Sequence, residues 1–265
     1  KKDQDLLFNS NTIAVDESGS ISWVDTEYDE GKFAEFRKKV NTNNVIQVNR
    51  TIFLWSFPIE LFSSFKKTQI LTYIFGGSIL KYYFDYHSVK YTHDVQDDKE
   101  IRSQIKELLK IYEGRSNKIG DNNTALSKSW FMESRKKQRR NIVSGIRNGI
   151  RGKGYKSHDI AFTTFKDYRE DLSFGGFTKG FIAVNSRATN DFAHKKFMAY
   201  CANRFVSPSL VTFFKEKDIV VDQNQFALAE MIQWVWRGCI RKDEPMELYM
   251  PSKRMREILI EWLKK

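Results

Sequence analysis

The run MELYMPSKRMREILIEWL at residues 246–263 shows how this chain is built. Met246–Met250 is typical of a short strand, and Ser252 is a good N-cap for a helix that continues to Leu263. Upstream of this unit, the C-terminal part of the chain alternates further strand and helix candidates. Alternation of this kind predicts the α/β class, with a mostly parallel sheet flanked by helices.

The other elements follow from apolar periodicity and from glycine and proline positions. Strands are expected at 69–75, 160–165 and 180–184. Gly76-Gly77 follows the first of these strands and precedes an aromatic helix. Helices are expected at 97–113, 192–205, 208–217 and 223–240.

The net charge points to a polyanionic partner. The chain has 44 lysines and arginines against 33 acidic residues, a formal charge of +11, which favours nucleic acid. No apolar run approaches the roughly 18–20 residues of a membrane span, and the N-terminal residues lack the apolar core of a signal peptide. We expect a cytoplasmic protein without a membrane partner, in which Cys201 and Cys239 are reduced thiols.

Residues 128–156 hold ten basic residues against the single acid Glu133. Ile142, Ile146 and Ile150 recur every four residues, which predicts a helix with one buried stripe. A basic helix with aromatic residues near its ends is typical of a sequence-tolerant nucleic-acid groove, although a solvated basic face has the same pattern. The candidate nucleic-acid contacts are Lys136, Lys137, Arg139, Arg140, Arg147, Arg151 and Lys153.

Several polar residues lie in a pattern that suits a phosphate ligand. Gln233, Arg237 and Arg241 are spaced i, i+4, i+8 on the expected helix, so forked guanidiniums would face one way. Ordinary surface arginines would give the same spacing. Asn185, Arg187 and Thr189 follow the expected strand at 180–184, where α/β proteins bind ligands, but turn and N-cap chemistry also explains them.

The N-terminal region predicts a hairpin. Apolar runs at 12–15 and 21–24 flank Ser18-Gly19-Ser20. Asp16 and Glu17 follow the first run, so one carboxylate could bind Mg²⁺ and the other a water. The alternative is an acidic hairpin turn.

Taken in order, these segments resemble the second half of a superfamily-2 helicase. Residues 69–75, which contain Thr72, are similar to motif III, and 160–165, which contain Thr163 and Thr164, to the opening strand of the second RecA-like domain. Residues 180–190 resemble motif V, and 233–241 resemble motif VI. The runs FPIELFSSFKKTQILTYIF, TTFKDYREDL and GFTKGFIAVNSRATNDF resemble helicase-like proteins of phages and mobile elements.

The resemblance implies a RecA-like sheet in 93–265, with a basic helical insertion at about 128–156. Residues 1–92 would be either a remnant of the first RecA-like domain or an N-terminal α+β segment. Arg237 would be the arginine finger, with Gln233 and Arg241 beside it. Thr72, Asn185, Arg187 and Thr189 would couple the nucleotide to the strand, and Thr163 and Thr164 would contact nucleic acid. Trp236 stands where motif VI has glycine, and Arg241 falls one position late, which weakens its assignment.

No G-x-x-x-x-G-K-[ST] loop occurs in the chain. ATP and Mg²⁺ would therefore bind only together with an N-terminal ATPase portion. Of the two nucleic acids, DNA is the preferred expectation over RNA. Two other classes stay open. One is a nucleic-acid-binding or replication accessory protein without ATPase activity, and the other is a metal-dependent nuclease that uses Asp16 and Glu17.

Overall fold

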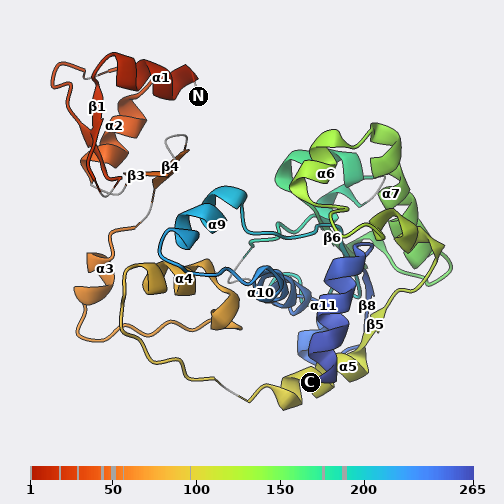
Figure 1. Cartoon of the computed structure of the whole chain (residues 1–265). Coiled ribbons are helices and arrows are strands. Elements are labelled where there is room, and N and C mark those ends of the chain that lie inside the picture. Colours follow the sequence, from red (N-terminus) through yellow and green to blue (C-terminus); the bar gives the residue numbers. More distant parts are fainter. Residues whose placement is uncertain are drawn as a thin grey trace. The chain divides into compact units, whose positions relative to one another are not determined.

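The computed structural model describes residues 2–17, 19–28, 30–42, 45–48, 52–55, 57–95, 97–174, 177–186 and 190–265. The chain forms two compact units that are interleaved along the sequence (Figure 1). The smaller unit comprises Lys1–Leu71, Tyr82–Val89 and Ser207–Val221, and the larger comprises Thr72–Lys81, Lys90–Val206 and Asp222–Lys265. The division thus differs from the single cut at residue 92 expected from the sequence.

The smaller unit contains two antiparallel hairpins. The predicted hairpin is confirmed as β1 (Ile13–Val15) paired with β2 (Ile21–Trp23), and β3 (Val45–Val48) pairs with β4 (Ile52–Trp55). Leu7, Ile13, Ile21, Val40 and Val45 form its small core. The helices of this unit are α1 (Lys2–Asn9), α2 (Ala34–Asn41), α3 (Glu60–Ser63), the end of α4 (Ile79–Tyr86) and α9 (Pro208–Lys215).

The larger unit is built on a four-stranded parallel sheet, which confirms the predicted α/β class. Its strands lie in the order β5 (Leu109–Ile111), β8 (Met246–Tyr249), β7 (Phe197–Tyr200) and β6 (Ile160–Thr163). All four residues of β6 and all four of β7 are buried, as expected of strands covered on both faces.

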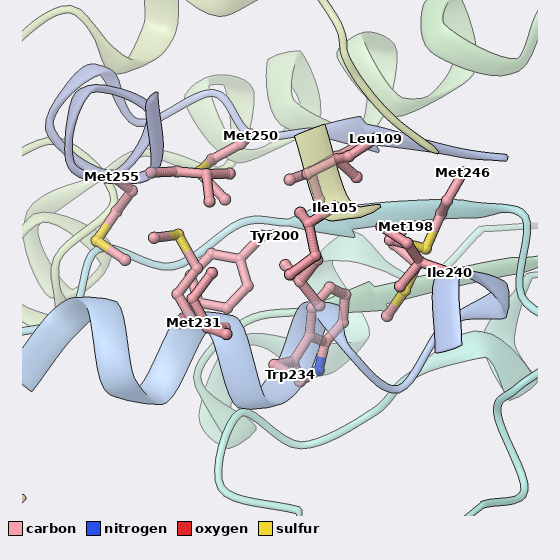
Figure 2. Packing of buried hydrophobic residues seen from close by; sticks show 14 of the residues in the cluster. Ile105, Leu109, Met198, Tyr200, Met231, Trp234, Ile240, Met246, Met250 and Met255 are labelled. Atoms are coloured by element: carbon pink, nitrogen blue, oxygen red, sulfur yellow. The ribbon is translucent and has the colours of Figure 1, made fainter. Parts of the chain in front are cut away.

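Helices cover both faces of this sheet. On one face, α5 (Lys99–Leu108), α10 (Gln223–Val235) and α11 (Lys253–Lys264) pack over alternate strand residues, among them Met198, Tyr200 and Leu248. Figure 2 shows Tyr200 between Met231 and Trp234 of α10. On the other face, α6 (Lys128–Glu133), α7 (Lys136–Ile150) and α8 (Arg169–Leu172) pack over Phe162, Phe197 and Tyr249.

Close backbone approach fixes α7 on the sheet. A Cβ at Gly145 would overlap the hydroxyl of Tyr249, and a Cβ at Gly149 would lie 2.7 Å from the ring of Phe197. Both glycines are buried within α7. Glycine has a low helix propensity, but at these two positions it allows the helix to pack closely on the sheet.

Four expectations about the elements are wrong. Residues 69–75 form no strand, and 180–184 contribute only an isolated bridge between Phe181 and Phe162. Part of the helix expected at 192–205 is the central strand β7, and the helix expected at 97–113 ends at Leu108, where β5 begins. The last two errors share a cause, because short buried strands and buried helix turns have similar apolar runs.

None of the helices in the described part combines the length and apolarity that a membrane span needs. Good caps define the C-terminal helices. Asp222 accepts the N–H groups of Asn224 and Gln225, both at 2.9 Å, and Ser252 caps α11 as predicted.

Candidate nucleic-acid interface

The carboxyl ends of the strands carry a buried polar cluster. Thr163 ends β6 and Thr164 follows it, and their side chains are 0% and 1% exposed. Neither hydroxyl has a hydrogen-bond partner within the described ranges. The structure therefore places these two predicted nucleic-acid contacts beneath the surface, at the edge of the sheet where open α/β folds bind ligands.

Arg254 organises this edge. Its guanidinium donates to four acceptors at 2.8–2.9 Å: the side-chain oxygens of Asn203 and Asn224 and the carbonyls of Arg204 and Gln223. Asn203, which is 1% exposed, donates in turn to the carbonyls of residues 123 and 125. This network joins the segment after β7 to the N-termini of α10 and α11.

Arg204 lies beside this network and has fewer bonds. Its Nη2 is 3.2 Å from Oε2 of Glu230, and its Nε has no partner among the described residues. The guanidinium lies 5.8 Å from the ring centre of Phe165 and 5.7 Å from that of Phe226. The side chain of Arg204 remains 23% exposed.

The residues assigned to motif VI do not share a helical face. Helix α10 ends at Val235, and Arg241 lies in the 3-10 turn η6 (Cys239–Lys242). Gln233 remains on α10, half-buried. The expected i, i+4, i+8 alignment is therefore wrong, because the chain turns after Trp236 and the amide of Cys239 donates to the carbonyl of Lys195, ahead of β7.

Arg237 is buried and donates to the carbonyl of Ser186. The structure thus brings together the segments predicted as motifs V and VI. The contact lies near the amino ends of the strands, because the neighbouring Gly238 packs against Met198 and Met246 at the start of β7 and β8. Arg237 therefore lies near the end of the sheet opposite to the carboxyl edge, where α/β proteins bind ligands.

The remaining predicted coupling residues are dispersed. Asn185 is exposed, and Thr72 is exposed in irregular chain rather than at a strand end. Arg187 and Thr189 lie outside the described residues.

Asp16 and Glu17 form the turn between β1 and β2, where Asp16 accepts the amide of Ser20 at 2.9 Å. The described part of the chain contains no group of three histidine, cysteine or acidic residues that could hold a metal. The carboxylate of Asp16 thus stabilises the hairpin turn, which was the alternative interpretation from the sequence.

The predicted basic helix is confirmed as α7, and its cations divide into two sets. Lys136, Arg140 and Arg147 lie on one exposed side of α7, and Arg151 follows directly after it. We call these four residues the basic face. Lys137 is exposed beside them.

The other two predicted cations of this region are engaged within the protein. Arg139 lies 2.8 Å from Asp171 and also donates to the carbonyl of Ser134. Lys153 pairs with Glu247 on β8. Their positive charge is therefore neutralised internally rather than offered to a ligand.

The sequence analysis missed Asn203, Arg204 and Arg254. A signal was available, because Asn203 and Arg204 follow the apolar run Phe197–Cys201. Interpreting that run as a strand would have placed both residues at a carboxyl edge. Nothing in the sequence marks Arg254, whose acceptors lie 30 to 51 positions away.

Comparison with protein families matches residues 103–263 to the YonV C-terminal Rossmann-like domain and residues 1–55 to the YonV middle domain. The chain is 37% identical over 288 residues to the SPbeta prophage-derived uncharacterized protein YonV of Bacillus subtilis (strain 168). That alignment covers 99% of this chain and 69% of the relative. No solved structure matches the chain.

Proposed function

We propose that this chain, which belongs to the YonV family, binds the phosphate backbone of nucleic acid through the basic face of α7. The basic face is the observation that carries the proposal. Its four cations extend over roughly 22 Å at the rise of an α-helix. No acidic residue occurs in Lys136–Ile150 to neutralise them.

The contacts within the protein support a ligand for these charges. Within the described ranges, the side chains of Lys136, Arg140 and Arg151 form neither an ion pair nor a hydrogen bond. Arg147 lies 4.8 Å from the ring centre of Phe174, which orients its guanidinium without neutralising it. Unneutralised cations along one helix suit sequence-independent contact with phosphates.

The broader proposal is that the chain is the C-terminal half of a helicase-like motor encoded by a prophage or related element. The hydrogen bond between Arg237 and Ser186 supports it, since it joins the two segments that resemble motifs V and VI. A finger role requires Arg237 to leave that carbonyl and to reach the nucleotide from its buried position near the amino ends of the strands. ATP and Mg²⁺ would bind only with a preceding ATPase portion.

An accessory role without ATPase activity remains the alternative, and one experiment separates the two. Under the motor proposal the isolated chain turns over ATP at background rate, whereas a longer chain with the preceding ATPase portion turns it over and loses this activity on Arg237→Ala. Unchanged turnover in a folded Arg237→Ala variant of the longer chain would favour the accessory role.

The basic face is tested by exchanging its four cations for glutamine and measuring fluorescence anisotropy of a labelled 20-base-pair DNA between 50 and 200 mM salt. Each lost phosphate contact lowers the salt slope by about 0.9, so the slope should fall by about 3 to 4. The matched control exchanges four exposed lysines elsewhere in the same unit: Lys106, Lys110, Lys264 and Lys265. Equal losses in both variants would show that only net charge matters.

A further inference from the structure

Among the described residues at the carboxyl edge, Arg204 has a guanidinium whose donors are largely unused. The guanidinium of Arg254 donates hydrogen bonds to four acceptors. Among the described residues, the guanidinium of Arg204 has one hydrogen-bond partner, Glu230, and its Nε has none. A guanidinium has five N–H donors, so Arg204 retains several for a ligand.

The surroundings hold this guanidinium in place but leave it accessible. Phe165, from the segment after β6, and Phe226, from α10, both lie within the range of a cation–π contact. The side chain of Arg204 is 23% exposed, so a ligand can reach it from solvent. Restriction by rings from two elements lowers the entropy that binding would cost.

Unpartnered buried groups lie on the same edge. Thr163 is paired in register with Tyr200, both residues are fully buried, and neither hydroxyl has a partner within the described ranges. Thr164 is also buried, and its hydroxyl has no partner among the described residues. Buried donors without partners are costly, and these three lie at the ends of the neighbouring strands β6 and β7, at the edge that Arg204 follows.

The course of the chain opens this edge between β6 and β7. After β6 the chain continues to α8, whose Leu172 packs on one face of the sheet, and after β7 it returns in α10 on the opposite face. Segments that leave neighbouring strands toward opposite faces create the crevice in which open α/β sheets bind ligands. Arg204 lies in the segment that follows β7.

We propose that Arg204 binds a phosphate group at this edge, exchanging its contact with Glu230 for phosphate oxygens. The phosphate belongs either to a free nucleotide or to a nucleic-acid strand. This site is separate from the basic face, and it does not depend on the function proposed for that face.

The two members of the ion pair predict opposite effects. Arg204→Gln removes the forked donors and should weaken phosphate binding about tenfold or more. Glu230→Gln removes the competing carboxylate and should strengthen binding about threefold to tenfold. A purely structural ion pair predicts the same direction for both variants, since each would disturb the same local packing.

The experiment uses the full chain with the four cations of the basic face already exchanged for glutamine, so that binding there is removed. Titration calorimetry with ATP tests the nucleotide source, and anisotropy with labelled dT20 tests the strand source. Binding of one probe that falls on Arg204→Gln and rises on Glu230→Gln supports the proposal and identifies the source. If neither probe shows this opposite response in variants that unfold at the wild-type temperature, the proposal is overturned.

Arg204→Lys covers the case in which Arg204→Gln does not fold. It keeps the charge and loses the fork, so it should retain intermediate affinity for the responding probe. Wild-type affinity in this variant, together with an unchanged Glu230→Gln, would also overturn the proposal. If the duplex titration shows that the basic face does not bind DNA, the test at Arg204 still stands. The two sites are measured in separate variants.

Discussion

The carboxyl edge of the sheet and the basic face of α7 are both rich in cations, but they use them differently. At the edge, the guanidinium of Arg254 reaches four acceptors and draws three segments together. On the basic face, Lys136 and Arg140 lie on an exposed helix surface with no acidic residue in the helix. The acceptors around a cation, rather than the charge of the surrounding sequence, therefore decide whether it holds the fold or awaits a ligand.

The largest effect is expected at the carboxyl edge. Arg254→Ala leaves the buried amide of Asn203 and two carbonyls without their donor, so the free energy of unfolding should fall by about 3 kcal/mol. Urea unfolding followed by circular dichroism measures this loss. A change below about 1 kcal/mol would mean that the network is not structural.

The two sides of α7 can be compared by alanine substitution. Gly145→Ala pushes a Cβ into Tyr249 and should cost about 2 kcal/mol, despite the better helix propensity of alanine. Asn141→Ala, on the exposed side, should change stability by about 0.5 kcal/mol or less. Thermal unfolding of both variants tests the contrast, which equal shifts would contradict.

Neighbouring arginines on α7 sharpen the comparison further. Arg139→Ala breaks the contact with Asp171 and should lower the free energy of unfolding by about 1 kcal/mol without changing the salt slope of DNA binding. Arg140→Ala should leave stability unchanged and lower that slope by about 0.9. Urea unfolding and anisotropy should be measured on both variants. A loss of stability in Arg140→Ala, or a lower salt slope in Arg139→Ala, would contradict the prediction.

Alkaline pH should lower the free energy of unfolding, through buried groups at the carboxyl edge, before it affects DNA binding by the basic face. Burial raises the pKa of Cys201 far above its ordinary value of 9.0, and burial also raises the pKa of Tyr200. With folded pKa values above the unfolded ones, stability is complete below about pH 8 and is lost as the pH rises above that value. The loss from Cys201 should be about 1 kcal/mol by pH 9.5.

Cys201→Ala tests this prediction, because it removes one of two thiols, Cys201 and Cys239, whose pKa burial raises. The variant should show a shallower fall of unfolding free energy between pH 8 and 9.5. DNA binding by the basic face should hold over this range in both proteins, because Cys201 is buried and is not part of that face. An unchanged pH dependence in Cys201→Ala would assign the alkaline loss to other groups.

Local sequence determined the elements whose patterns are self-contained. The hairpin of β1 and β2 has its own turn, α7 has its own apolar stripe, and Ser252 marks the start of α11. The alternation of elements along the chain predicted the parallel sheet, and the polyanionic partner that the charge favours stays a prediction. The hairpin, the helix and its N-cap each depend on residues within one segment, so a short window of sequence contains the relevant physics.

Tertiary structure alone decided which apolar runs became strands and which cations became structural. Phe197–Tyr200 is a strand because β6 and β8 supply its hydrogen bonds from both sides. Arg139 differs from Arg140 because Asp171, far along the chain, lies beside only one of them. Ladder partners and counterions come from distant segments, so their effect enters only when the chain has folded.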